Sequence, residues 1–425
     1  MKTRRAAALG TAVVVAAALS ACTGVSGGGG GNGGGGGGDG IRFLIPTPED
    51  AATQDLIEQD IAAFSEESGI DVQVDTAPLE QLRTVLQTQL RSGSGPDVFR
   101  YDTGPGFAGA LNEAGLLYDL TDAAANWDIY PFAQEKVTFD GKVVGIPDEL
   151  ETIGIFYNKD VLDDNGIAEP QSVDDLVAAA QTLKDAGVTP FAFGNQEGWE
   201  AGHVFSMALN SSLGPDGVQA LIDGDSSWES PEVVDALDLV FRQFQESGFY
   251  PQSPNGINYD DMTGLFLTGQ AAMAPTGTWL ISDISANADF EVGFVPFPAP
   301  DGEGVFTGGL GSGLFMSANS DNTEDALELM NYLASEEHGQ FEVEQLQLIP
   351  AFPVDAEGSE ASELFSLVLQ DTADFAAGGG SLGPNIDVNM SDDFNKAMSD
   401  GFQALLNGDA TAEDVAAQLQ AAAAA

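Results

Sequence analysis

The sequence predicts an α/β fold whose sheets are rich in parallel strands. Short apolar runs typical of buried strands alternate with longer segments in which apolar residues recur every three or four positions, as on one face of a helix. This alternation continues from residue 41 onward and is not replaced by separate blocks of strands and helices. That is the pattern of layered α/β proteins.

The first predicted elements follow one another closely. A strand at residues 41–45 leads to a helix that stops at Gly69. A second strand around residues 72–74 leads to another helix, which ends in the turn-forming residues 92–96, and a third strand covers residues 97–101. The apolar stripes of the two helices are Leu56, Ile57, Ile61 and Phe64, and then Leu82, Val85, Leu86 and Leu90.

Later helices repeat this pattern. Ser172 and Asp175 resemble an N-terminal capping pair. A stripe that ends before Gly248 and another near residue 330 indicate two more amphipathic helices. Their apolar residues are Val233, Val234, Leu237, Phe241 and Phe244, and then Ala326, Leu327, Met330 and Leu333.

The charge of the chain excludes several classes of partner. Its 425 residues include 13 Lys+Arg and 67 Asp+Glu, which gives a net charge of −54. So few cations exclude most nucleic-acid partners and anionic membrane surfaces. The acids are spread along the sequence, so we expect a solvated acidic coat, either as an adaptation to high salt or for solubility. With 43% hydrophobic residues, the chain can fill about two or three domains.

Residues 1–21 are expected to be a signal peptide. Three cations precede an apolar stretch at residues 6–19, which is too short to span a membrane. The stretch ends in Leu19-Ser20-Ala21-Cys22, which resembles a bacterial lipobox, so we expect acylation of Cys22; the alternative is a chance cysteine. Residues 22–40 would then be the acylated Cys22 and a flexible glycine-rich stalk. Because Cys22 is the single cysteine, an intrachain disulfide is excluded.

Signals of catalysis are few. With only two histidines, His203 and His338, and no cysteine inside the fold, Cys/His zinc sites and cysteine nucleophiles are excluded, and we expect neither a metal nor a cofactor. Residues 104–109 match G-x-G-x-x-G, but Pro105 removes a backbone N–H that a phosphate would need. A carboxylate pair such as Asp148 and Glu151 leaves a secreted glycoside hydrolase open as an alternative.

A series of short motifs resembles the bacterial family 1 extracellular solute-binding proteins, the group of the maltodextrin-binding protein. The resemblance covers about residues 41–420 and depends on the order of the motifs. They are SGPDV (94–98), GKVVGIP (141–147), FYNKD (156–160), GIAEP (166–170), GQAAM (269–273), GTW (277–279), LIP (348–350) and PNI (384–386).

The resemblance implies two α/β lobes with a ligand cleft between them, the type II periplasmic-binding-protein-like fold. Three chain crossings near residues 149–152, 305–311 and 348–354 would form a hinge. The N-terminal lobe would comprise residues 41–150 and 308–350, and the C-terminal lobe residues 151–307 and 351–425. The implied function is a lipid-anchored monomeric receptor, not an enzyme, that binds a carbohydrate at the outer face of the membrane and delivers it to the permease of an ABC importer.

The same resemblance points to three principal site residues, and the position of a predicted strand points to a fourth. Glu151 matches a carboxylate that accepts sugar hydroxyls, and the alternative is a solvated hinge acid. Trp279 and Trp199 match stacking aromatics, and the alternative for both is core packing. Asp102 follows the third strand, where α/β sheets place ligand loops, although a helix-capping acid also fits.

Four weaker candidates complete the expected site: Thr47, Glu49, Gly309 and Phe394. The other cleft aromatics of the maltodextrin-binding pattern have no counterparts in this chain. A long maltodextrin is therefore not the expected ligand.

Overall fold

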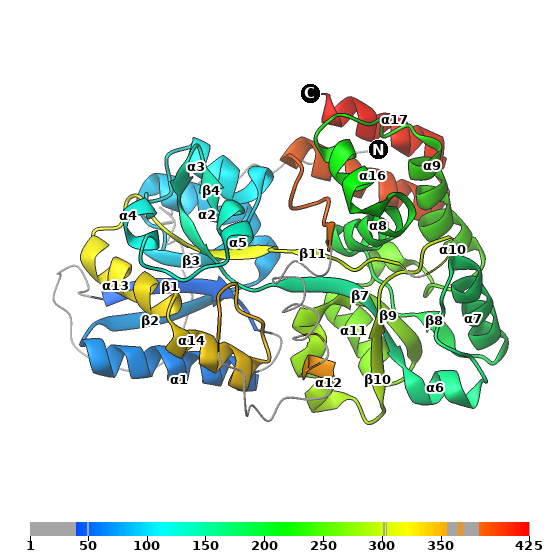
Figure 1. Ribbon diagram of the computed structural model, residues 1–425, viewed down its shortest axis with the longest axis horizontal. Helices are drawn as coiled ribbons and strands as arrows, with labels where there is room; N and C mark the ends of the chain where they lie inside the picture. The colour runs from blue at the N-terminus through cyan, green and yellow to red at the C-terminus, as the bar shows by residue number, and fades with distance from the viewer. Residues whose placement is uncertain are drawn as a thin grey trace, which may run out of the picture. The chain divides into compact units, whose positions relative to one another are not determined.

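The computed structural model describes residues 40–48, 51–300, 302, 304–354, 364–366, 368 and 382–424 (Figure 1). Residues 39–425 form one compact unit. Two large sheets organise it, and we call them the N-sheet and the C-sheet. In the described part of the chain, none of the helices combines the length and apolar character needed to cross a bilayer.

The N-sheet has five strands in the order β2-β1-β3-β12-β6. β1 pairs in parallel with β2 and β3, while β12 pairs antiparallel with β3 and β6. The strands are β1 (Gly40–Pro46), β2 (Asp71–Ala77), β3 (Val98–Asp102), β6 (Gly145–Pro147) and β12 (Ser312–Met316), with a separate hairpin of β4 (Thr138–Phe139) and β5 (Lys142–Val143).

Amphipathic helices pack against the N-sheet. Leu82, Leu86 and Leu90 of α2 are fully buried with Phe99 and Phe315 in one hydrophobic cluster. The helices of this part are α1 (Ala51–Ser68), α2 (Leu79–Ser92), η1 (Pro105–Gly109), α3 (Ala110–Glu113), α4 (Thr121–Ala124), α5 (Pro131–Glu135), α13 (Thr323–Leu333), α14 (Glu336–Phe341) and η5 (Glu342–Leu346).

The C-sheet is built around β7, which pairs with β9 on one side and with β10 and β11 on the other. β8 extends the sheet beyond β9, and β13 extends it beyond β11. The strands are β7 (Glu151–Asn158), β8 (Thr189–Phe191), β9 (Ala271–Gly277), β10 (Val292–Val295), β11 (Thr307–Gly309) and β13 (Gly383–Pro384).

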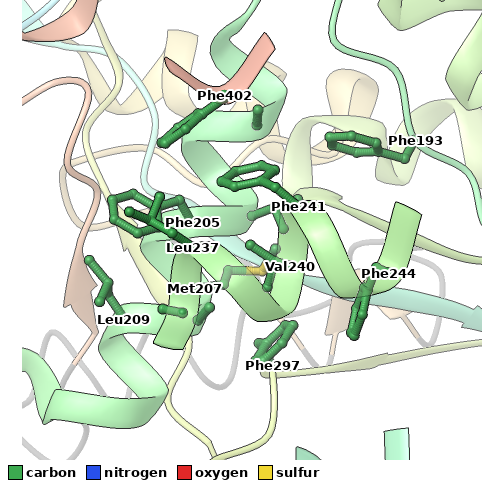
Figure 2. Close-up of a cluster of buried hydrophobic side chains, with 14 of the residues drawn as sticks. Phe193, Phe205, Met207, Leu209, Leu237, Val240, Phe241, Phe244, Phe297 and Phe402 are labelled. Atoms are coloured by element: carbon green, nitrogen blue, oxygen red, sulfur yellow. The ribbon is translucent and has the colours of Figure 1, made fainter. Parts of the chain in front are cut away.

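The helices around the C-sheet bury an aromatic core (Figure 2). Phe241 and Phe402 stack with ring centroids 4.3 Å apart, and Phe205 meets Phe402 edge-on at 5.1 Å. The helices are α6 (Lys159–Asp164), α7 (Val173–Asp185), α8 (Trp199–Ile222), α9 (Pro231–Leu237), η2 (Asp238–Gln243), α10 (Phe244–Glu246), η3 (Pro254–Gly256), α11 (Tyr259–Leu267), η4 (Thr278–Leu280), α12 (Ile281–Asn287), α16 (Asp392–Asn407) and α17 (Ala412–Ala423).

Local sequence patterns predicted the first three strands correctly. The predicted strands at 41–45, 72–74 and 97–101 correspond to β1, β2 and β3. Ser172 caps α7 as expected, since its hydroxyl accepts the Asp175 N–H at 3.2 Å. The stripe of residues 233–244 is divided among α9, the π-helical η2 and α10, and it remains one apolar face with Phe241 and Phe244 buried.

The chain passes between the two sheets in three places. Residues 148–150 join β6 to β7, residues 310–311 join β11 to β12, and a third passage lies between η5 and β13. The first and third passages are paired, because Glu149 forms a bridge with Pro350 and the Leu150 N–H donates to the Ile349 carbonyl at 2.8 Å.

Candidate ligand-binding site

Strand ends from both sheets meet around Glu151. In the N-sheet, β3 ends at Asp102, which pairs with the first residue of β12, Ser312. In the C-sheet, β7 begins at Glu151, which pairs with the last residue of β11, Gly309. Figure 1 shows β7 and β11 running side by side at this point. The ends of β3 and β11 and the starts of β7 and β12 are therefore gathered in one region. The carboxyl ends of strands are the usual place of ligand sites in α/β sheets.

The carboxylate of Glu151 is fixed by the backbone of a neighbouring passage. Its Oε2 accepts a hydrogen bond from the Gly311 N–H at 3.1 Å. A Cβ on Gly311 would lie 2.2 Å from the same oxygen, so any larger residue there would force the carboxylate to move. Burial raises the pKa of Glu151 well above its usual range, and the neighbouring Glu149 carboxylate raises it further. Glu151 is therefore a positioned, half-buried acid and not a freely solvated one.

The structure brings Trp199 and Trp279 together from distant parts of the sequence. Their ring centroids lie 6.2 Å apart at an interplanar angle of 66°, and both side chains are half-buried. Tyr259 packs 4.7 Å from Trp199, and its hydroxyl accepts a hydrogen bond from Trp279 Nε1 at 2.6 Å. We call Trp199, Tyr259 and Trp279, with the nearby His203, the aromatic cluster.

The aromatic cluster is tied to the strand that carries Glu151. Thr152, the next residue, donates its N–H to Oγ1 of Thr278 at 3.1 Å, and Thr278 directly precedes Trp279. The Trp279 ring also lies against Gly277, where a Cβ would meet ring carbons at 2.0 Å. The expected carboxylate and the expected tryptophans thus belong to one site.

Two residues of this site, His203 and Asp387, were not among the predicted binding residues. His203 lies one turn after Trp199 on α8, and its ring is 5.0 Å from Trp199 and 5.4 Å from Trp279. Its Nε2 lies 3.5 Å from Oδ2 of Asp387. The spacing of four residues between Trp199 and His203 was the one signal in the sequence, because residues i and i+4 share a helix face.

Asp102 enters the site as half of an ion pair. Its two oxygens accept hydrogen bonds from Nε and Nη2 of Arg83 at 2.8 and 2.7 Å. The guanidinium of Arg83 also lies 5.3 Å from the centre of the Phe107 ring. Asp102 therefore lies at the predicted edge with its charge already neutralised.

A second arginine connects β3 to the first passage between the sheets. Arg100 forms ion pairs with Asp148 and, at 3.4 Å, with Glu149, and it donates to Ser312 Oγ at 3.3 Å. Burial raises the pKa of Glu149 to about 7, with Asp148 adding to the shift and Arg100 opposing it. Asp148 also accepts a hydrogen bond from the Ser312 hydroxyl at 3.2 Å.

The weaker candidates for the ligand site that the structure describes lie in different parts of the fold. Thr47 is exposed after β1, and its N–H donates to the Ala77 carbonyl. Gly309 lies on β11 opposite Glu151 with φ 141°. Phe394 was wrongly predicted as a ligand residue, because its side chain is fully buried and packs 4.7 Å from Trp228 in the core. Glu49 and the predicted acylation site Cys22 lie outside the described residues.

The glycine-rich motif at residues 104–109 serves chain packing. Gly104 has φ 87°, and a Cβ there would lie 1.8 Å from the carbonyl oxygen of Val388. Nearby, Lys136 Nζ donates to Asn389 Oδ1 at 3.1 Å. The loop after β3 therefore contacts the segment that carries Asp387, which links the N-sheet part to the C-sheet part at a second place besides the passages.

Among the residues that the structure describes, no group of three or more His, Cys, Asp or Glu side chains is arranged to hold a metal ion. The site consists instead of half-buried aromatic rings, positioned carboxylates and a histidine.

Comparisons with known proteins show the family and the fold of the chain. Residues 46–340 match the family model described as bacterial extracellular solute-binding protein. The multiple sugar-binding protein of Streptococcus mutans is 25% identical over 262 residues, which are 59% of this chain and 61% of that protein. The galactooligosaccharide-binding protein of Bacillus subtilis is 26% identical over 318 residues, or 71% of each chain.

A solved structure shows the fold. A protein from a study of xylan utilization by the thermophilic bacterium Caldanaerobius polysaccharolyticus superposes with a TM-score of 0.82 at 22% identity, covering 90% of this chain and 99% of the other. This confirms the two-lobed periplasmic-binding-protein-like α/β fold that the sequence predicted.

Proposed function

The chain belongs to the bacterial extracellular solute-binding protein family, and we propose that it is a lipid-anchored receptor that binds a carbohydrate and delivers it to an ABC importer. One observation carries the choice of ligand: the half-buried Trp199 and Trp279 lie beside the strand that positions the Glu151 carboxylate. Aromatic rings pack against the apolar C–H faces of sugar rings, and a carboxylate accepts hydrogen bonds from hydroxyl groups.

The names of the relatives support a carbohydrate. Two are called multiple sugar-binding and galactooligosaccharide-binding proteins, and the similar structure comes from work on xylan utilization. These names differ in the sugar, so they support the ligand class and leave its identity to experiment.

Ligand uptake would involve movement of two lobes about the three passages, with residues 41–150 and 308–350 in one lobe and 151–307 and 351–425 in the other. The contacts of Gly104 with Val388 and of Lys136 with Asn389 join these parts. We propose that such contacts form in the closed, ligand-holding state and break on opening. We further propose that the protein delivers the bound carbohydrate to a permease and that acylated Cys22 anchors it to the membrane.

The alternative of a secreted glycoside hydrolase is less favoured by the contacts of its carboxylate pair. Asp148 is engaged by Arg100 and by the Ser312 hydroxyl, and Glu151 accepts the Gly311 N–H. A general acid needs a proton that it can donate to the leaving group. Glu151 has the raised pKa that suits this role, so Asp148 would have to act as the nucleophile or base, and its carboxylate is already held by Arg100 and Ser312.

A sugar screen tests the proposed function. The purified chain is melted in the presence of mono- and oligosaccharides, and each mixture is then assayed for hydrolysis products. A ligand at a hundred times its Kd stabilises the folded state by about 2.7 kcal/mol, so a binding sugar raises the melting temperature. A raised melting temperature with the sugar unchanged is the expected result. No shift with any sugar would contradict carbohydrate binding, and product formation would favour the hydrolase.

A further inference from the structure

The charged groups around Glu151 are mostly acids. After burial, the neighbouring carboxylate of Glu149 is the strongest influence that raises the pKa of Glu151, and Asp387 and Asp102 act in the same direction. Arg100 acts in the opposite direction. Most of the ionisable groups that influence Glu151 are therefore acids, and Asp387 is the one of them without an arginine partner among the described contacts.

The two nearby arginines already form ion pairs with acidic side chains. Arg83 binds both oxygens of Asp102, and Arg100 is shared between Asp148 and Glu149. Neither arginine is paired with Glu151 or Asp387 in the contacts of the described residues. An anionic group of a ligand would therefore meet carboxylates without a matching cation.

Lys136 does not change this balance. Its Nζ donates to Asn389 Oδ1, two residues from Asp387, and burial lowers the pKa of Lys136, which weakens its hold on a proton.

A second and independent observation comes from the aromatic cluster. His203 is only 7% exposed, and its Nδ1 is buried without a hydrogen-bond partner among the described residues. The Oδ1 of Asp387 is in the same state, while its Oδ2 lies 3.5 Å from His203 Nε2. Buried polar atoms without partners are rare and costly, so a ligand that supplies donors would satisfy them.

An ammonium group suits these features better than a hydroxyl group. It carries three donors and a positive charge, and the face of a tryptophan ring attracts cations. A carboxylate opposite the ring faces adds a charge-assisted hydrogen bond. Trp199 and Trp279 within ring contact of His203, together with Asp387 and Glu151, provide both kinds of interaction.

We propose that this site selects a carbohydrate that carries a protonated amino group over its neutral counterpart, and that it rejects sugars that carry a carboxylate or phosphate. The inference rests on the proposed function, because it names the chemical class of sugar at the same site. Asp387 is the specificity-determining residue, and it acts together with Glu151.

Matched sugars test the proposal directly. The probes are the β-1,4-linked trimers of glucose, glucosamine and N-acetylglucosamine, and the monomers glucose, glucosamine and glucuronate. Each is titrated by calorimetry into the full chain at about pH 6, below the usual pKa of an amino group. We expect the glucosamine compound of a series to bind at least tenfold more tightly than its glucose or N-acetylglucosamine counterpart, and glucuronate to show no binding.

Two variants show where the selectivity arises. Asp387→Asn keeps the shape and removes the charge, so it should lower the ratio of amino-sugar to neutral-sugar affinity about tenfold. Asp225→Asn removes the same charge from an exposed position and should leave the ratio unchanged. If Asp387→Asn does not fold, Glu151→Gln takes its place, with the same expected direction, because a bound ammonium group favours the ionised form of Glu151 and glutamine has no ionised form.

The outcomes separate the inference from the function on which it rests. Neutral sugars that bind as tightly as their amino counterparts, or binding of glucuronate, would overturn the inference and leave the carbohydrate receptor standing. An affinity ratio that Asp387→Asn and Glu151→Gln leave unchanged would overturn the assignment to these acids. Failure of every sugar to bind would overturn both proposals.

Discussion

The N–H of Gly311 donates a hydrogen bond to Oε2 of Glu151 at 3.1 Å, and this contact joins the passage between β11 and β12 to the first residue of β7. The acid at the proposed ligand site is thus held by a segment through which the chain passes from one sheet to the other. Glycine at this position keeps the carboxylate in place, because a Cβ would lie 2.2 Å from it and displace it.

We expect Gly311→Ala to displace the Glu151 carboxylate. Overpacking of a filled site typically costs about 1–3 kcal/mol, so the free energy of unfolding should fall by that amount and sugar affinity should fall with it. Urea unfolding and calorimetric titration measure the two effects. Gly264→Ala is the matched control, since a Cβ there meets no atom within 4 Å and helix α11 favours alanine. Equal stability of both variants would show that the Gly311 contact is dispensable.

A buried network of charges lies in the N-sheet part of the fold. His338 Nδ1 lies 2.9 Å from Asp60 Oδ2, and the Tyr332 hydroxyl donates to Asp60 Oδ1 at 2.6 Å. His338 Nε2 lies 3.6 Å from Glu342 Oε1. Burial alone would lower the pKa of His338, but the charges of Glu342 and Asp60 outweigh it, so this pKa is raised.

These shifts predict a protein that is more stable in mild acid than in mild base. Burial raises the pKa of Glu149 from 4.5 to about 7 and that of Glu342 from 4.5 to about 8. Between these values the folded protein keeps protons that the unfolded chain has lost. The stabilisation is therefore complete below the unfolded pKa of 4.5, and it is lost as the pH rises through the folded values near 7 and 8. The raised pKa of His338 acts in the same direction.

Urea unfolding at a series of pH values checks this expectation. The free energy of unfolding should decline between about pH 5 and about pH 9. The Glu342→Gln variant has no titratable group at this position. Its free energy of unfolding should therefore decline less steeply with pH than that of the unaltered chain. A stability that rises with pH over this range would contradict the assignment of neutral carboxyl groups to the fold.

The lipid anchor yields a prediction that does not depend on the ligand. Cys22→Ser removes the thiol that acylation requires, so we expect the variant to fold normally and to be released from the membrane. Cell fractionation followed by a melt of the released protein measures both properties. Retention of Cys22→Ser in the membrane fraction would contradict anchoring through this residue.

Where a family motif carries the residue, the sequence named residues that the structure brings together. Trp279 in the GTW motif and Glu151 near a predicted crossing lie together at the meeting edge of the sheets. Phe394 was assigned to the ligand site, although the sequence around it indicates a core position. Phe394, Met398 and Phe402 recur every four residues along α16 and are all buried. That spacing is typical of a core-facing stripe.

Other features of the site depend on packing that no local pattern encodes. Arg83 and Asp102 come from α2 and β3, and their bidentate pairing requires the helix to lie beside the end of the strand. Asp387 reaches His203 from a segment 184 residues further along the chain. Its neighbours are positioned by buried contacts such as the hydrogen bond from Ser206 Oγ to Asn385 Oδ1.

Calorimetric titration of Trp279→Ala with a sugar that binds the unaltered chain tests the central claim most directly, when it is combined with a melt of the ligand-free variant. If Trp279 forms a wall of the sugar site, the dissociation constant should rise about tenfold or more, because a tenfold change corresponds to about 1.4 kcal/mol. The melting temperature should fall only moderately, since the side chain is half-buried. Unchanged affinity together with a collapsed melting temperature would contradict the account and assign Trp279 to the core.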